Sequence, residues 1–432
     1  MSSERCVQVL DGELNTYSVI KKITELPNQE DPFYVCDVSK LIWLYNNWKA
    51  LLPRVEFFYA MKCNDYKLVL ETFAAIGSGF DCASDEEIRK ILALNVHPDK
   101  IIFANPTKLI HHIEYAAKVG VKTMTFDSLE ELNKIKKHHP EAELLIRIRC
   151  DDVSAKYVLG KKFGALPNED SLDLLKAAKS LNLNVIGVAF HVGSGCMNYG
   201  IYYEAIAAAR KVFDMGRELG FKFKILDIGG GYPGDSKKPL NQIADLINRG
   251  LNEYFPDNSI RVIAEPGKYA VNTAFKLVTQ INSKNIIRSI KGDIRMYYVD
   301  VSVYNSMINV LFNDYYDCRP VNEMDNEKLH PSIIWGPTHE SNDRLSETYH
   351  YLPDLKIGDW VILEEIGGYS LCISCGYNGF PIPNVCGVVN KKDWLLLAET
   401  VTNPVPKIRF TTSIEYFLKN LELSSYTFTR YF

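Results

Sequence analysis

Polar residues or glycines follow most of the short apolar segments in the first two thirds of the chain. One polar residue at such a place carries little information, because every strand must end somewhere. A lysine, an arginine, a histidine and a glutamate at the same edge of one fold indicate a reactive site. The residues are Lys62, Asp81, Arg147, His191, Ser194, Gly229, Gly230, Gly231 and Glu265.

These residue types fit the chemistry of one cofactor. A lysine near apolar walls can lose its proton and form a Schiff base with an aldehyde. A glycine triplet lets backbone N–H groups approach a phosphate closely, and the Ser194 hydroxyl can add a donor. Glu265 can pair with a pyridinium nitrogen, and His191 can stack on the ring. Together they predict a site for pyridoxal 5′-phosphate, held on Lys62.

The apolar segments that precede these residues have the character of parallel strands. Most are almost continuously apolar, as strands covered on both faces are. Helical patterns separate them, and two of these open with capping signatures at Ser84 and Asp127. Eight strands with helical returns predict an α/β fold with a closed (β/α)8 TIM-like barrel, whose chemistry lies at the C-terminal ends of the strands. The segments are residues 55–60, 79–82, 101–104, 123–126, 144–148, 185–190, 225–228 and 261–264.

A doubly wound open sheet is the alternative architecture. In that fold the glycine triplet would be part of a dinucleotide-binding turn. The Tyr-Pro-Gly-Asp that follows it lacks the GxGxxG spacing, so we reject this reading.

The pattern changes after about residue 270. Alternating apolar runs separated by turn signals predict an all-β C-terminal domain, and the strand-like segment 33–37 is expected to pair with it. We therefore expect an N-terminal segment over residues 1–40 that partly joins the β domain, a cofactor-binding barrel over 41–270 and a β-rich domain over 271–432.

The amino-acid composition limits the classes of molecule that this protein is expected to bind. The 432 residues include 49 basic and 53 acidic ones, which argues against a nucleic acid or an anionic membrane surface as the main partner. No run of about 18 apolar residues occurs, and the N-terminus has no secretory pattern. The ten cysteines are scattered, so we expect a reduced, cytoplasmic protein without a metal. His111 and His112 are adjacent, so their side chains should point to different sides of a helix and lie at the surface.

A series of short motifs carries a resemblance that covers about residues 30 to 395. In their order and spacing these motifs resemble those of the eukaryotic ornithine decarboxylases, which are pyridoxal-phosphate enzymes with an alanine-racemase-like fold. The motifs are FYAMKCN (58–64), GFDCAS (79–84), IIFANPTK (101–108), MTFDS (124–128), KKFGA (161–165), FHVGSG (190–195), LDIGGGYPG (226–234), AEPGKY (264–269), WGPTHESND (335–343) and GGYS (367–370).

The resemblance implies a role for each matching residue. Lys62 matches the lysine that holds the cofactor, Glu265 the partner of the ring nitrogen and His191 the ring-stacking histidine. Asp81 and Arg147, with Glu87, match the charged shell around them. Phosphate contacts match Ser194, Gly230, Gly231 and Tyr369, with Lys268 as a further cation. The family implies a homodimer with two shared active sites, in which the WGPT segment of one subunit reaches the barrel of the other.

The sequence departs from the family pattern around the substrate. His339 and Glu340 stand where the family has Cys-Asp, so His339 and Lys62 are the candidate proton donors. Asn313 replaces one of the two carboxylates expected to hold the distal ammonium of the substrate. Lys268 replaces an arginine and can bind phosphate only as a point charge. The expected substrate-binding residues are Tyr304, Asn313, Glu340 and Tyr377.

Three functions follow from the resemblance and these departures. The first is pyridoxal-phosphate-dependent decarboxylation of L-ornithine to putrescine and CO2 in polyamine biosynthesis. The second is decarboxylation of lysine or arginine, although Glu340 shortens the pocket rather than lengthening it. The third is a catalytically weak or inactive homologue that resembles the antizyme inhibitors and binds an antizyme-like protein. The retained lysine, glycine triplet, histidine and glutamate favour cofactor binding.

Overall fold

The computed structural model describes residues 6–12, 14–150, 155–196, 198–238, 240–288, 290, 292–312, 314–322, 327–346, 348–400 and 409–411. The chain divides into two compact units. The first, the barrel unit, consists of Trp43–Cys63 and Phe73–Ala270. The second, the β unit, consists of the described residues of Met1–Ile42, Asn64–Thr72 and Val271–Phe432.

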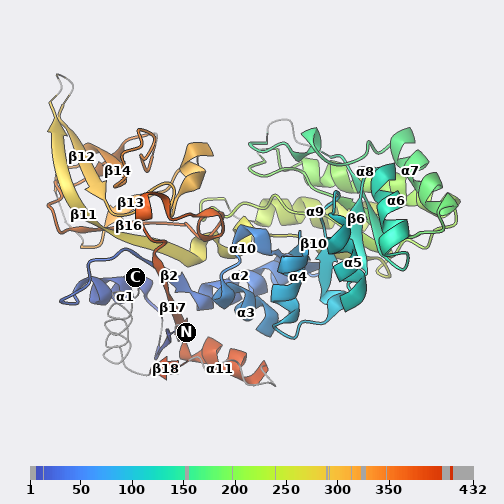
Figure 1. Cartoon of the computed structure of the whole chain (residues 1–432), viewed down its shortest axis with the longest axis horizontal. Coiled ribbons are helices and arrows are strands. Elements are labelled where there is room, and N and C mark those ends of the chain that lie inside the picture. Colours follow the sequence, from blue (N-terminus) through green and yellow to red (C-terminus); the bar gives the residue numbers. More distant parts are fainter. Residues whose placement is uncertain are drawn as a thin grey trace. The chain divides into compact units, whose positions relative to one another are not determined.

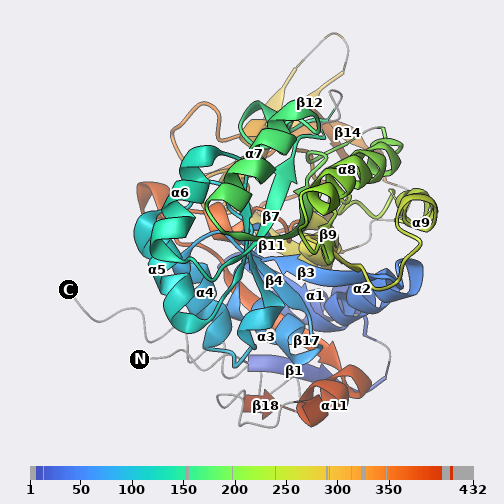
Figure 2. The same ribbon diagram turned by 90° about the vertical axis from the view of Figure 1, so that its right-hand side faces the viewer.

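Eight parallel strands of the described chain form the closed barrel that the sequence predicts. Each strand pairs in parallel with the next, and β10 closes the circle against β3. Figure 2 shows helices α4 to α9 around the outside of these strands. The strands are β3 (Val55–Ala60), β4 (Gly79–Cys82), β5 (Ile101–Phe103), β6 (Thr123–Phe126), β7 (Glu143–Ile148), β8 (Asn184–Phe190), β9 (Ile225–Asp227) and β10 (Arg261–Ala264).

Apolar side chains from most of the strands meet in one cluster of the barrel core. Filling the interior with branched and aromatic side chains makes the barrel a packed core rather than a channel. Burial of these side chains removes apolar surface from water, which is the main force that holds the strands in place. The cluster contains Phe58, Ile102, Leu145, Ile186, Ala189, Ile225 and Ile263.

Helices α4, α6 and α7 of the barrel begin at polar caps, Ser84, Ser128 and Asn168. The Ser84 side chain accepts a hydrogen bond from Glu87 N at 3.3 Å, as the capping signature predicts. The second signature is shifted by one residue, because Ser128 rather than Asp127 caps its helix. The Asp127 carboxylate instead accepts a hydrogen bond from Gly164 N at 2.8 Å. The helices are α2 (Val38–Leu51), α3 (Lys67–Ala75), α4 (Asp85–Leu92), α5 (Ile110–Val119), α6 (Leu129–His138), α7 (Glu169–Ser180), α8 (Ile201–Glu218), α9 (Asn241–Tyr254) and α10 (Lys268–Val271).

The β unit is built on one mixed sheet, most of whose strands are labelled in Figure 1. Its main path runs β15-β14-β12-β11-β2-β17-β1-β18, and β16 joins at β11 with β13 beside it. β2 comes early in the chain, yet it pairs antiparallel with β11 and parallel with β17. The strands are β1 (Cys6–Leu10), β2 (Phe33–Asp37), β11 (Phe275–Ile287), β12 (Ile294–Val299), β13 (Cys318–Pro320), β14 (His330–Trp335), β15 (His350–Leu352), β16 (Trp360–Leu363), β17 (Asn384–Asn390) and β18 (Arg409–Thr411).

Helices also contribute to the β unit. Helix α1 (Thr16–Thr24) places Val19, Ile20 and Ile23 in the same core cluster as side chains of β2, β11, β16 and β17. Helix α11 (Lys391–Thr400) follows β17 directly. The unit is therefore mainly a β-sheet, with helices packed on it where the sequence predicted strands alone.

None of the helices in the described ranges combines the length and the apolarity that a membrane span requires.

Candidate active site

Lys62 lies just beyond the end of β3, at the C-terminal rim of the barrel. It occupies a short 3-10 turn, Met61–Cys63, that follows the strand. Its amine forms an ion pair with Asp81, which lies opposite Ala60 in the strand pairing. The Lys62 side chain is 42 % exposed, whereas that of Asp81 is 1 % exposed. The carboxylate is thus fixed inside the protein, and the amine it orients remains accessible from the rim.

The glycine triplet after β9 forms a turn in which side chains do not fit. Gly229 and Gly231 have φ values of +61° and +105°, in the left-handed region that favours glycine. A Cβ at Gly229 would lie 2.0 Å from the carbonyl oxygen of Phe190, the last residue of β8. A Cβ at Gly230 would lie 2.8 Å from the carbonyl oxygen of Glu265. The triplet is therefore wedged between the ends of β8 and β10.

A second loop packs against the triplet. It follows β8 and carries His191 and Ser194. The carbonyl oxygen of Gly193 lies only 2.4 Å from the position of a Cβ on Gly231. Ser194 N donates to the carbonyl oxygen of Tyr157 at 3.2 Å, which holds the loop in place. The two glycine-containing loops thus place Ser194 and the triplet side by side at one edge of the barrel.

The imidazole of His191 lies directly over this turn. Its Nδ1 accepts a hydrogen bond from Gly193 N at 3.0 Å, and its Nε2 lies 2.9 Å from the Cβ position of Gly230. Burial lowers the pKa of His191 well below its usual value, and the nearby charges of Arg147 and Lys62 lower it further. The ring is therefore neutral at physiological pH, with Nδ1 as an acceptor, and presents an uncharged aromatic face.

Glu265 follows β10 and is 8 % exposed. Its Oε1 is buried and has no hydrogen-bond partner within the described part of the chain. Burial raises the pKa of Glu265 well above its usual value, and the carboxylates of Asp227 and Asp81 raise it further. A buried acceptor without a donor is unfavourable, so this oxygen is suited to a donor that the chain itself does not supply.

Asp227 is a buried carboxyl that the sequence reasoning missed. It is the last residue of β9, it accepts a hydrogen bond from Gly229 N at 2.9 Å, and it is hydrogen-bonded to Glu265. Burial raises the pKa of Asp227 to about 7. An acidic residue at the end of an apolar strand, directly before the glycine triplet, was the available signal. Asp227 both orders the turn and adds to the rise in the pKa of Glu265 that burial causes.

Two cations complete the rim set predicted from the sequence. Arg147, on β7, is half-buried, and its guanidinium lies 5.2 Å from the ring centroid of Phe163. Its charge lowers the pKa of Glu265 and of Asp227, against the larger effect of burial. Lys268 is half-buried at the first residue of α10, three positions after Glu265. In the barrel unit, His191 therefore interacts electrostatically with Arg147 and Lys62. Glu265 interacts with Asp81, Lys62 and Arg147.

The expected substrate residues that the structure describes gather in the β unit. Tyr304 donates its hydroxyl proton to Glu340 Oε2 at 2.8 Å, and the rings of Tyr304 and Tyr377 lie 4.6 Å apart. Asn342 N donates to the same carboxylate at 2.8 Å. The hydrogen bond from Tyr304 lowers the pKa of Glu340, and the pKa of Tyr304 rises to about 12. Asn313 lies outside the described residues.

The WGPT segment that carries these residues is held by a carboxylate that sequence reasoning also missed. Asp343 is fully buried, and its two oxygens accept hydrogen bonds from Val303 N at 2.8 Å and from the Thr338 hydroxyl at 2.6 Å. It thereby links this segment to the turn before Tyr304. His339 lies between these anchored residues and is exposed. The segment thus presents an imidazole and a carboxylate at fixed positions on the β unit.

Tyr369, the expected phosphate contact outside the barrel, also belongs to the β unit. It has a φ of +53°, a left-handed conformation that is unusual for a tyrosine. The neighbouring Gly368 N is held by Asn272 Oδ1 at 3.1 Å. Strained residues of this kind concentrate at ligand-binding and catalytic sites.

An accessible amine at the C-terminal rim of a closed barrel, beside a turn that only glycine can form, places the protein among barrel enzymes that carry pyridoxal phosphate. Three comparisons support a narrower assignment. Residues 38–272 match the pyridoxal binding domain of the pyridoxal-dependent decarboxylases. The chain is 41 % identical to ornithine decarboxylase of Rattus norvegicus over 419 residues, covering 92 % of this chain and 90 % of the relative. It is 42 % identical to antizyme inhibitor 2 of Xenopus laevis over 376 residues, covering 84 % and 82 %.

A solved structure agrees with this assignment. The arginine decarboxylase of Paramecium bursaria Chlorella virus has a TM-score of 0.81 at 36 % identity, and the match covers 85 % of this chain and 99 % of the viral one. The chain therefore belongs to the pyridoxal-dependent decarboxylase family, and pyridoxal phosphate is the cofactor of that family.

The residues at the rim fit this cofactor. The buried Oε1 of Glu265 has no donor among the residues that the structure describes, and a protonated pyridine nitrogen is one. The turn at residues 229–231 leaves no room for side chains and so exposes backbone amides to a phosphate. The amine of Lys62 is accessible at the same rim.

Proposed function

We propose that this protein is a pyridoxal-phosphate-dependent decarboxylase that converts L-ornithine to putrescine and CO2, in polyamine biosynthesis. The observation that carries the proposal is the buried Oε1 of Glu265, which no donor of the described residues reaches, at the rim that also presents Lys62. The 41 % identity to an ornithine decarboxylase supports the choice of substrate.

Lys62, Glu265 and His191 hold the cofactor ring in this proposal. Lys62 is the attachment point, and its amine is oriented by Asp81. Glu265 would accept a hydrogen bond from the ring nitrogen, and the neutral imidazole of His191 would support the ring. Arg147 adds positive charge beside Glu265 and Asp227. Bound pyridoxal phosphate supplies an electron-withdrawing ring that accepts the electron pair left on Cα when CO2 departs.

The phosphate is held by backbone and side-chain donors. The amides of Gly230 and Gly231 and the hydroxyl of Ser194 lie on two loops that pack together. Lys268 provides a positive charge as a compact ammonium, and Tyr369 is a further candidate for a phosphate contact. Fixed donors of this kind bind an anion without reorganising on binding.

The β unit recognises the substrate and returns the proton. Glu340 is kept ionised by the hydrogen bond from Tyr304 and pairs with the distal ammonium of ornithine. Tyr377 packs beside Tyr304 and lines the aliphatic part of the substrate, and Asn313 contributes a neutral polar group. His339 donates a proton to Cα after CO2 has left.

We infer that the working molecule is a cytoplasmic homodimer with two shared active sites. The cofactor residues lie in the barrel unit and the substrate residues in the β unit. In a dimer in which the β unit of one chain completes the barrel of its partner, the cofactor residues of one subunit would meet the substrate residues of the other. A twofold arrangement creates two such sites at once.

The alternative functions predict different rates of CO2 release from different amino acids. The match to an antizyme inhibitor and the replacement of cysteine by His339 favour a binding protein that captures an antizyme-like partner. The match to an arginine decarboxylase favours a longer substrate. CO2 release from ornithine, lysine and arginine should be measured in parallel on the cofactor-loaded protein. Turnover of ornithine above the other two supports the proposal. Preferred turnover of lysine or arginine would replace the substrate, and a cofactor-loaded protein without any turnover would replace the activity.

A further inference from the structure

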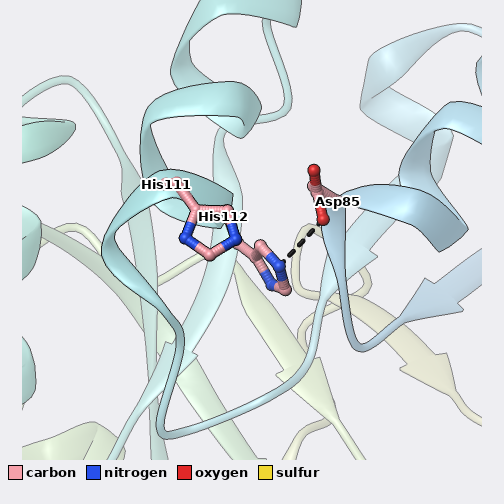
Figure 3. Close-up of side chains that lie close together, drawn as sticks. All are labelled: Asp85, His111 and His112. Carbon is pink, nitrogen blue, oxygen red and sulfur yellow. Dashed lines mark ion pairs between the residues drawn. The ribbon is translucent and has the colours of Figure 1, made fainter.

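Outside the candidate active site, three potential metal ligands converge at the C-terminal side of the barrel. Asp85 is the first residue of α4, and His111 and His112 lie in the first turn of α5. Figure 3 shows the two imidazoles beside each other, with His112 turned towards Asp85. His112 Nε2 lies 2.8 Å from Asp85 Oδ1, and one ligand atom of each residue lies within 4.8 Å of the others.

The close approach of the two imidazoles corrects the expectation from the sequence. Adjacent residues of a helix were expected to point apart, but the ring centroids of His111 and His112 lie 4.3 Å apart. Both residues lie in the first helical turn, as the second and third residues after the N-cap residue Leu109. Their rings converge despite the helical rotation between their Cα atoms.

Two imidazoles and one carboxylate select a particular class of ion. Zinc binds imidazole nitrogen at about 2.0–2.1 Å and carboxylate oxygen at about 2.0–2.2 Å, so three ligands a few ångströms apart can close on it with small side-chain rotations. Magnesium and calcium prefer oxygen ligands and would gain little from the imidazoles. His112 is already oriented by Asp85, and the side chain of His111 is exposed.

Neighbouring charges act against a cation here and limit its affinity. Arg89 pairs with the other oxygen of Asp85 at 3.3 Å, while its guanidinium lies over the ring of Tyr115. The first turns of α4 and α5 also carry the positive ends of their helix dipoles. The Arg89 side chain is half exposed, so it can leave Asp85 for solvent when a stronger partner arrives.

We propose that Asp85, His111 and His112 form a binding site for a zinc-like divalent transition-metal ion that ties the start of α4 to the start of α5. Asp85 follows the turn that connects Asp81 to α4, so a bound ion would restrain a segment next to the candidate active site. The ion would be held by three protein ligands, and water would complete its coordination.

Zinc titration of the cofactor-loaded protein by isothermal calorimetry tests the site. Wild type should bind one zinc ion per chain at this site, and zinc should raise its melting temperature because the ion binds the folded state. His112→Gln and Asp85→Asn should each weaken that binding by at least about tenfold, since even second-shell partners of metal ligands are worth about 10–100-fold in affinity. Both substitutions keep a polar side chain, and circular dichroism should show that the variants are folded.

His138→Gln is the matched control. His138 pairs with Glu114 of α5 at 2.8 Å, so it is also a histidine–carboxylate pair, but it lies outside the three-ligand group. It should bind zinc as wild type does. Absence of one-to-one binding in wild type, unchanged affinity in both His112→Gln and Asp85→Asn, or an equal loss in His138→Gln would each overturn the proposal.

Discussion

The side-chain amine of Lys62 is paired with the carboxylate of Asp81, at the ends of neighbouring strands of the barrel. Asp81 is almost fully buried, so its position is set by the core, and the lysine is oriented through it. The same rim carries the buried carboxyl of Glu265, whose Oε1 receives no hydrogen bond from the described part of the chain. The oriented amine of Lys62 and the hydrogen-bond acceptor of Glu265 together determine which ligand the site can bind.

Glu265→Gln should retain part of the bound cofactor and lose most of the decarboxylation rate. A neutral amide cannot keep the ring nitrogen protonated, so the rate should fall by about 10²-fold or more, a usual loss for one electrostatic stabiliser. Steady-state kinetics and the visible absorbance of the bound cofactor measure the two effects separately. Glu143→Gln, at the opposite end of a barrel strand, is the control and should keep the wild-type rate. A wild-type rate in Glu265→Gln would remove this residue from the mechanism.

Asp227 makes the stability of the cofactor-free protein depend on pH. Burial raises its pKa to about 7, whereas an aspartate in the unfolded chain titrates near pH 4. The folded state therefore binds more protons between these values, and stability falls as the pH rises from about 4 to about 7. Asp227→Asn can still accept the hydrogen bond from Gly229 N but cannot ionise. The contribution of residue 227 to the decrease in stability with rising pH should therefore disappear. Melting temperatures at pH 5, 6, 7 and 8 test this, and parallel curves for the two proteins would contradict it.

Mixing two inactive variants tests the shared active site. Lys62→Ala removes the residue that holds the cofactor in the barrel unit. Glu340→Ala removes a substrate-binding residue of the β unit. In a dimer with shared sites, each mixed dimer has one intact site, so a random mixture should regain about a quarter of the wild-type rate. Lys62→Ala mixed with Glu265→Gln should regain nothing, because both changes lie in the barrel unit. Lack of recovery in the first mixture would mean that the sites are not shared.

His339→Cys should change the response to a substrate analogue that becomes an alkylating agent after decarboxylation. The imidazole of His339 is a weaker nucleophile towards such agents than a thiolate, so wild type should resist labelling. The cysteine variant should be labelled at residue 339, which mass spectrometry of digested protein would locate. Cys375 is an exposed thiol in both proteins and reports non-specific alkylation. Stoichiometric labelling of wild type at any residue would contradict the expectation.

Much of the barrel could be predicted from the sequence because its strands are continuous apolar runs. Every barrel strand was located to within one residue, and the rim residues Lys62 and Glu265 follow those strands directly. A short, almost continuously apolar run fits few structures other than a buried parallel strand. The local sequence pattern and the observed barrel therefore agree.

The remaining features depend on tertiary contacts that no local pattern encodes. Asp227 and Asp343 matter because they are buried beside particular backbone amides, and burial of a polar residue is not readable from its neighbours in sequence. The convergence of His111 and His112 results from their place at a helix end, where the rule for helix interiors fails. The helices of the β unit escaped prediction because the strand signals around them dominate the pattern.

Reduction of the cofactor-loaded protein with borohydride, followed by peptide mapping, tests the central claim most directly. Reduction fixes the cofactor to the amine that holds it, and mass spectrometry identifies the modified lysine. The account predicts one phosphopyridoxyl group per chain, on the peptide that contains Lys62. A modified lysine elsewhere in the chain, or no modification at all, would contradict it.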